Sequence, residues 1–210
     1  MTRGMIGGLA LLAAVAGGQT VAAQDRPTIL PTRDVAITYR ATGPVQGQQQ
    51  QQDLKVAFTS AGRLMRVEGV GGQMSGAYVI VDHTTQRMMM VMAGDRRFIE
   101  MPVNNAFSRG FLLSESMKFV RRGGDSVVGV KCTVWDITSP EAVGTACLTE
   151  DGVMLRGSGL DGKGALVATS VTYGAQSAAL FKPPADFSKI EIPAGMPPAG
   201  MAPGSRPPGR

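Results

Sequence analysis

Apolar and β-branched residues alternate with polar ones in short runs through most of the chain. Turn signals rich in Gly, Pro, Asp or Asn separate one run from the next. A two-residue period broken by frequent turns predicts an antiparallel meander of strands, not a fold in which strands and helices alternate. We expect strands over residues 34–42, 53–60, 63–70, 77–82, 87–92, 97–101, 125–137, 145–150, 152–157 and 163–173.

Two internal segments depart from this period. In residues 104–120, Phe107, Phe111, Leu112 and Met117 recur at roughly helical intervals and Asn104 or Asn105 can cap the start, which predicts one or two short helices. The stretch VQGQQQQQ, residues 45–52, is polar and low in complexity, which predicts a flexible hairpin loop. The pattern therefore predicts a mostly β domain with a short helical insertion.

The two ends of the chain differ in composition from its middle. Residues 1–23 combine a basic start with an apolar run shorter than the roughly 20 residues of a membrane-spanning helix. We interpret them as a signal peptide cleaved near Ala23, which predicts a periplasmic or secreted protein that is not an integral membrane protein after cleavage. Residues 24–192 would form the domain, and 193–210 a disordered tail rich in Pro and Gly.

Charge and residue types exclude two broad classes of function. The formal net charge is +5, the basic residues are scattered, and one Trp and three Tyr offer no base-stacking platform, so we expect no nucleic-acid partner. Nucleophilic catalysis with a histidine base needs that histidine beside a nucleophile, yet the one histidine, His83, lies in the predicted turn DHTTQ. We expect no enzymatic activity and no cofactor.

Cys132 and Cys147 are the only cysteines. An even number in an exported protein favours a disulfide, and the alternative of a redox-active pair lacks the Cys-x-x-Cys spacing. If the strands around them form a hairpin centred on Ser139–Pro140, the two cysteines lie directly opposite each other. Closing so short a loop would add roughly 3 kcal/mol of stability.

The run RMMMVM, residues 87–92, carries the most distinctive candidate chemistry. On a strand, Met88, Met90 and Met92 share one face. Three thioethers could bind Cu(I), with His83 as a further ligand. They could also line an adaptable apolar cavity, because methionine is flexible and polarisable. A third interpretation is ordinary core beneath segment 104–120, and the sequence leaves all three open.

Two stretches of the sequence resemble a known protein family. GDSVVGVKCTVWDI…ACLTEDGVMLR, with DHTTQRMMMV before it, resembles a family of uncharacterised bacterial periplasmic proteins near the LolA/LolB-like lipoprotein-carrier superfamily. The resemblance covers residues 33–190. It implies an open, unclosed antiparallel β-barrel wrapped around one or two helices, with an inner apolar surface that holds acyl chains without covalent chemistry.

We therefore expect a non-catalytic periplasmic binding or carrier protein for a lipid, an acyl chain or another apolar ligand, with an envelope protein as a candidate partner. The alternatives are a copper-binding protein that uses the methionines and His83, and a structural envelope interaction module. The predicted ligand-binding residues are Met65, Met88, Met90, Met92, Met101, Phe107 and Phe111.

Overall fold

A computed structural model describes residues 26–45, 48–70, 76–103, 113–140, 143–158 and 164–191, so the predicted signal peptide and tail lie outside the described residues. Within these ranges the chain is mostly strand, with one 3-10 helix near the end. The elements are β1 (Val35–Val45), β2 (Gln48–Thr59), β3 (Leu64–Val70), β4 (Ala77–Asp82), β5 (Arg87–Met92), β6 (Arg97–Pro102), β7 (Lys118–Val127), β8 (Val130–Thr138), β9 (Val143–Leu148), β10 (Met154–Ser158), β11 (Ala165–Tyr173), η2 (Ala178–Phe181) and β12 (Ser188–Ile190).

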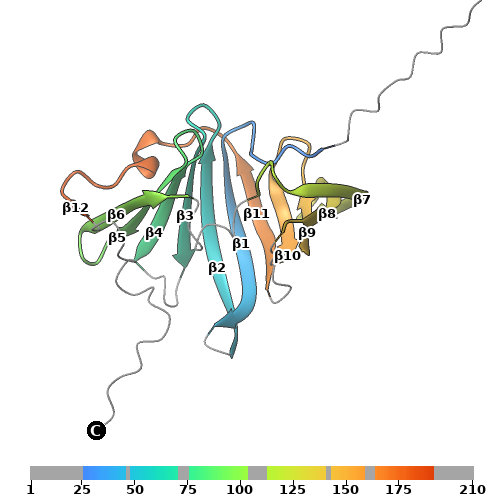
Figure 1. Cartoon of the computed structure of the whole chain (residues 1–210), viewed down its shortest axis with the longest axis horizontal. Helices are drawn as coiled ribbons and strands as arrows, with labels where there is room; N and C mark the ends of the chain where they lie inside the picture. Colours follow the sequence, from blue (N-terminus) through green and yellow to red (C-terminus); the bar gives the residue numbers. More distant parts are fainter. Residues whose placement is uncertain are drawn as a thin grey trace, which may run out of the picture.

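All twelve strands belong to one sheet, in the order β12-β6-β5-β4-β3-β2-β1-β11-β10-β9-β8-β7 (Figure 1). Neighbouring strands are antiparallel, apart from the parallel pair of β12 with β6. β7 and β12 stand at opposite ends of this order and do not pair with each other in the described part of the chain. The prediction of a mostly β fold with an open antiparallel sheet is confirmed.

The helices that the sheet was expected to wrap around are not found among the described residues. Residues 104–112, with Phe107 and Phe111, lie outside them; residues 113–117 form turns and irregular chain, and Lys118 begins β7. Phe119 of β7 lies opposite Ile137 of the neighbouring strand β8. Met117 is buried in a cluster that also contains Ile137. For residues 113–120, the described part of the predicted helical segment 104–120, the prediction is wrong, because cross-strand packing outweighs the helical spacing of these residues.

Two other boundaries differ from the predicted ones. Residues 48–52 of the glutamine-rich stretch are not a loop but the start of β2, paired with β1. Glutamine does not prevent this, because the ladder uses backbone groups. The strand predicted over 125–137 is two strands joined at Val128 and Gly129, whose φ angles of 46° and 77° suit a two-residue hairpin turn.

Cys132 and Cys147 form a disulfide with a Cα–Cα distance of 5.4 Å, as predicted. The register around it differs from the prediction, because Cys147 lies opposite Val134 and not opposite Cys132. The bond joins diagonal neighbours on one face of the β8–β9 pair, and the connecting loop is centred one residue later than expected. Both cysteines belong to a buried cluster with Val35 and Leu155.

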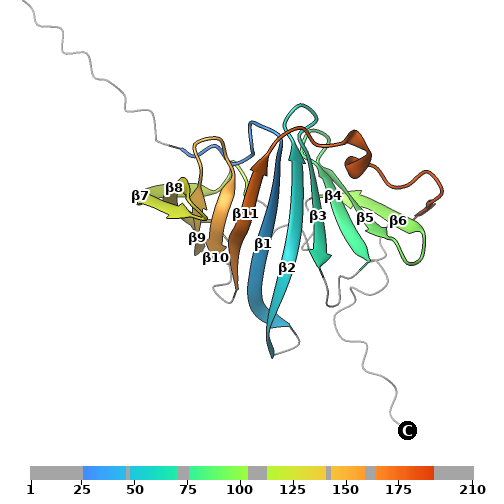
Figure 2. The ribbon, with the colours of Figure 1, turned by 180° about the vertical axis from the view of Figure 1, so that it is seen from behind.

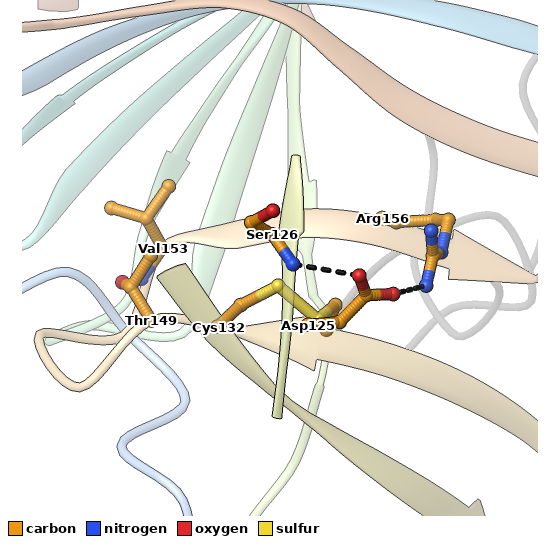
Figure 3. The surroundings of a disulfide bond; sticks show 7 residues. Asp125, Ser126, Cys132, Thr149, Val153 and Arg156 are labelled. Atoms are coloured by element: carbon orange, nitrogen blue, oxygen red, sulfur yellow. Dashed lines mark hydrogen bonds and ion pairs between the residues drawn. A yellow bond between two sulfur atoms is a disulfide. The ribbon is translucent and has the colours of Figure 1, made fainter. Parts of the chain in front are cut away.

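The sheet curls strongly at its β7 end. Arg156 of β10 forms an ion pair with Asp125 of β7 beside the disulfide, although β9 and β8 lie between those strands (Figure 3). In a flat sheet, strands three positions apart would be about 14 Å from each other, since neighbours lie roughly 4.8 Å apart. β7 also contacts β11, still farther along the sheet.

The central strands β4 and β5 carry buried apolar side chains on both faces of the sheet, and these belong to different clusters. We call the face that carries Met65, Val79, Met88 and Met101 the methionine face; these side chains belong to two adjoining clusters. On the opposite face, Tyr78, Ile80 and Val91 pack with Phe181 of η2. Figure 2 shows the C-terminal segment on this side, running from β11 toward the β6 edge of the sheet.

One arginine secures that C-terminal segment. The Arg66 guanidinium lies 3.4 Å from the centroid of the Tyr78 ring and donates through Nη1 to the carbonyl of Leu180. Its Nη2 pairs with Glu68 at 3.0 Å. A single side chain of β3 thus connects the sheet with the chain that covers it.

The extended segment before β1 is held by the β9–β10 turn. Arg33 donates through Nε and Nη2 to Oδ2 of Asp151 and stacks 4.0 Å from the Tyr173 ring centroid. The Thr32 amide donates to the Asp151 carbonyl at 2.9 Å. Arg33 and Tyr173 lower the pKa of the Asp151 carboxyl, as does its hydrogen bond from Thr149, although burial opposes the shift most strongly.

Replacing Val128 with Asn should stabilise the protein. A β-branched residue at φ 46° is strained, whereas Asn adopts this conformation readily and Asn-Gly suits the turn. We expect a gain of about 1 kcal/mol, seen as a rise of roughly 2–4 °C in Tm. Val128→Ala, which removes the branch without the Asn preference, should gain less. A lower Tm for Val128→Asn would show that the turn is not strained.

Replacing Gly152 with Ala should destabilise the protein. Gly152 has φ +87°, and an added Cβ would lie 2.3 Å from the Leu30 carbonyl oxygen. We expect a loss of at least about 2 kcal/mol, measured by denaturant unfolding, because the backbone of the N-terminal segment has to move away. Gly94→Ala is the matched control, since its Cβ would meet nothing within 4 Å. Equal stability of the two variants would contradict the close packing of the segment.

Candidate functional site

A continuous row of apolar side chains crosses the methionine face. The register of β2 to β6 places Phe58 opposite Met65, Met65 opposite Val81, Val81 opposite Met88 and Met88 opposite Met101. We call these five residues the Phe58–Met101 row. Phe58, Val81, Met88 and Met101 are buried, with exposed fractions of 1–6 %, and Met65 between Phe58 and Val81 is partly buried.

Met90 and Met92 lie on the same face as Met88, in the next rows along β5. Met90 is opposite Val79 on one side and Ile99 on the other, while Met92 is opposite Ala77. Both are less buried than Met88. The structure thus brings five of the seven predicted ligand-binding residues to one face, whereas Phe107 and Phe111 lie outside the described residues. Their part in binding a ligand stays a prediction.

The alternate residues of β5 have a different environment. Met89 and Val91 point to the opposite face and pack in the cluster of Phe181. Val91 is fully buried there. The run RMMMVM therefore contributes apolar side chains to clusters on both faces of the sheet, and the C-terminal segment covers one of these faces.

A cavity of about 510 Å³ lies at the Phe58 end of the row. Its apolar wall includes Phe58, Phe119, Ile29 and Leu30, from β2, β7 and the segment before β1. Arg26, Arg63 and Glu115 supply its charged groups. A mixed lining of this kind, in a volume within the roughly 300–1,000 Å³ range of small-molecule sites, suits a ligand with an apolar body and a polar end. Sequence reasoning missed this cavity, because its walls come from segments far apart in the chain.

Two groups of hydrogen bonds hold the cavity walls. Arg26 donates through Nη2 to the carbonyls of Glu115 and Met117, which ties the N-terminal segment to the start of β7. Asp34 accepts from the Ser60 amide at 2.8 Å and from the Ser60 hydroxyl at 3.0 Å, which fixes the turn after β2. These backbone and hydroxyl donors lower the pKa of Asp34, so the carboxyl stays ionised at neutral pH.

His83 lies beside the cavity but is not one of its lining residues. Its ring centroid is 6.3 Å from that of Phe58, and its amide donates to the Arg63 carbonyl at 3.1 Å. Burial lowers the pKa of His83 and the nearby Arg63 charge lowers it further, against the opposite influence of Asp82. The imidazole is therefore neutral at pH 7, and its buried Nε2 has no hydrogen-bond partner within the described ranges.

The described residues offer little for metal or nucleophilic chemistry of the usual kinds. Among them, no group of three or more His, Cys, Asp or Glu side chains could hold a metal ion. The disulfide leaves neither cysteine free as a thiolate. No helix in the described part of the chain is long and apolar enough to cross a membrane. What the geometry offers is an apolar face that leads to a cavity with charged groups.

Several solved structures are similar to this chain at low sequence identity, and the first of those named here shares its fold. An uncharacterized conserved protein from Thermus thermophilus is 15 % identical, with a TM-score of 0.53 over 76 % of this chain and 90 % of that chain. A chain of the Pseudomonas aeruginosa MucA/MucB complex is 14 % identical, with a TM-score of 0.47 over 79 % of this chain and 62 % of that one. A LolA superfamily protein from Nitrosomonas europaea is 8 % identical, with a TM-score of 0.42 over 74 % and 92 %.

The similar structures include this LolA superfamily protein and a putative outer membrane lipoprotein-sorting protein domain from Vibrio parahaemolyticus, as the predicted resemblance implies. No curated protein matches the chain. One sequence family does match it, over residues 39–158, from the middle of β1 to the end of β10, and its description is "Domain of unknown function (DUF4412)". This match spans more than half of the chain, and the protein belongs to that family.

Proposed function

We propose that this protein is a non-catalytic binding or carrier protein of the bacterial periplasm, and that its ligand is a lipid, an acyl chain or another apolar molecule. The observation that carries the proposal is the largely buried Phe58–Met101 row, which ends in the wall of a 510 Å³ cavity. A ligand there would gain roughly 25 cal/mol for each Å² of apolar surface removed from water.

The residue types on this face favour a ligand of variable shape. Met65, Met88 and Met101 make up most of the row, and methionine fills irregular apolar space better than a branched side chain does. Met90 and Met92 beside the row are only partly buried. An acyl chain, which has no fixed conformation, suits such a surface.

The compartment belongs to the same proposal. A disulfide between Cys132 and Cys147 is typical of an oxidising compartment. The apolar segment at residues 1–23 has the pattern of a signal peptide. A carrier of acyl chains in the bacterial envelope would work in the aqueous space between two membranes, where a cavity would keep the bound acyl chain out of contact with water.

Copper binding is a second candidate. Met88, Met90 and Met92 share a face, and the neutral imidazole of His83 has an Nε2 with no hydrogen-bond partner among the described residues. Soft thioether ligands favour Cu(I). Same-face residues of one strand lie about 6.6 Å apart, however, so the three sulfur atoms converge on one ion only if their side chains lean together. This geometry ranks copper below an apolar ligand.

Filling the cavity should weaken the binding of an apolar probe. Ile29 lines the cavity but belongs to none of the buried clusters of the described chain, so Ile29→Trp should occupy the space without disturbing the core. We expect the affinity for the neutral fluorophore N-phenyl-1-naphthylamine to fall at least about tenfold, or 1.4 kcal/mol, in fluorescence titrations. Val143→Trp is the control, because Val143 is 66 % exposed and does not line the cavity. Equal affinities for both variants and the unmodified protein would place the probe elsewhere.

The triple change Met88→Leu, Met90→Leu and Met92→Leu should separate the two candidates. Leucine keeps volume and apolarity at a cost under about 1.5 kcal/mol per site, and it removes every thioether of this face of β5. We expect the fluorophore to bind the unmodified protein and the triple leucine variant alike. We expect neither of these two proteins to bind stoichiometric Cu(I) in competition with bicinchoninate. Met89→Leu, on the opposite face, controls for the loss of a sulfur atom. Tight Cu(I) binding that only the triple change removes would favour copper instead, and binding of neither ligand would favour an interaction module.

A further inference from the structure

Most arginines of the described chain are neutralised, whereas the two that line the cavity are not. Within the described ranges, seven form ion pairs with carboxylates: Arg33, Arg40, Arg66, Arg87, Arg96, Arg122 and Arg156. Arg26 and Arg63, which both line the cavity, pair with no carboxylate among those residues. Two unneutralised cations in one cavity wall call for a functional explanation.

Arg26 is held in place, yet part of its guanidinium remains available. Nη2 donates to the carbonyls of Glu115 and Met117, and Cζ lies 5.9 Å from the Phe119 ring centroid. In the described part of the molecule, Nε and Nη1 have no acceptor. A guanidinium that is fixed by neutral carbonyls keeps its full charge, so it is ready to bind an anion at little entropic cost.

Arg63 stands in the tight turn between β2 and β3. Its amide donates to the Ser60 carbonyl at 3.3 Å, and its own carbonyl accepts from the His83 amide at 3.1 Å. The backbone is therefore anchored on both sides, while the exposed side chain has no partner among the described residues. Phe58, the first residue of the row, lies two positions before Ser60.

The remaining charge in the lining comes from Glu115. Two arginines and one glutamate leave a net charge of +1 on the cavity wall. A cationic ligand would meet unfavourable charge there, and a wholly apolar one would desolvate two guanidinium groups without compensation. An anionic group at the arginines, with an apolar chain against Phe58 and Phe119, satisfies both halves of the lining.

We propose that the cavity binds an amphiphile with an anionic head group, a carboxylate or a phosphate, at Arg26 and Arg63, and that its acyl chain runs along the Phe58–Met101 row. This inference rests on the proposed function and adds the class of ligand and its orientation. The head group lies at the open cavity and the chain lies toward β6.

The test compares probes that share a twelve-carbon chain and differ in the head group. Laurate and lauroyl lysophosphatidate are anionic, monolaurin is uncharged, and lauroyl lysophosphatidylcholine is zwitterionic. Each would displace N-phenyl-1-naphthylamine from the full exported protein. We expect both anionic probes to bind at least about tenfold more tightly than monolaurin, since hydrogen bonds to charged groups are the stronger ones. The ratio of the laurate affinity to the lysophosphatidate affinity shows whether the natural ligand is a free fatty acid or a phospholipid.

Charge variants locate the head group. Arg63→Gln should weaken laurate binding about tenfold and leave monolaurin binding unchanged, because only the charged contact is lost. Arg26→Gln also removes the hydrogen bonds to the carbonyls of Glu115 and Met117, so it should weaken the binding of both probes, and that of laurate more. Glu115→Gln should tighten laurate binding, since it removes the one carboxylate of the lining. Arg97→Gln is the matched control: Arg97 is exposed at the far end of the methionine face, opposite Met92, and has no ion pair within the described chain.

The outcomes separate this inference from the function on which it rests. Monolaurin binding without preference for anions, or equal effects of all three arginine changes, would overturn the head-group site and leave the apolar carrier in place. Loss of laurate binding only in Arg97→Gln would reverse the orientation and also overturn the inference. If no probe, including the fluorophore, binds the full protein, the proposed function fails together with the inference.

Discussion

The candidate site depends on an antiparallel register that continues without a shift from β1 through β6. Side chains alternate between faces along a strand, so a slip of one residue in β5 would exchange Met88 with Met89 and break the Phe58–Met101 row. The register shifts of the described sheet occur only in its other half, between β1 and β11, β9 and β10, and β7 and β8. The half of the sheet without register shifts carries the Phe58–Met101 row. The half with register shifts is the one that curls.

Burial on both faces accounts for the unusual composition of the central strands. A sheet with one solvated face alternates apolar and polar residues, whereas strands covered on both sides are apolar throughout. Ile80 and Val91 face η2, and Val81 and Met88 face the methionine side; all four are almost fully buried. The run RMMMVM therefore needs no metal to explain its density of methionines, although flexible side chains in the methionine-face positions suit a surface that changes shape.

Some residues that line the cavity lie within the region that matches the family, and others lie before it in the chain. Phe58, Arg63 and Phe119 lie within residues 39–158, while Ile29 and Arg26 precede them. The N-terminal wall is held through Arg33 and the turn at Asp151 and Gly152, near the end of the matched region. One short segment before the matched region thus supplies part of the wall of the open cavity at the Phe58 end of the row.

The sequence by itself determined the positions and the antiparallel arrangement of most strands, because alternation and turn residues act locally, although it predicted ten strands where the described chain has twelve. It also predicted the shared face of Met88, Met90 and Met92 and the pairing of Cys132 with Cys147, which follow from strand geometry and from cysteine count. Only the tertiary structure decided that Met117 and Phe119 pack against β8 instead of forming a helix, and that Cys147 lies opposite Val134. It alone brought Arg26 and Arg63 to one cavity. Such placements depend on which strands become neighbours and how far the sheet curls, and these are set by long-range packing that no local pattern in the chain encodes.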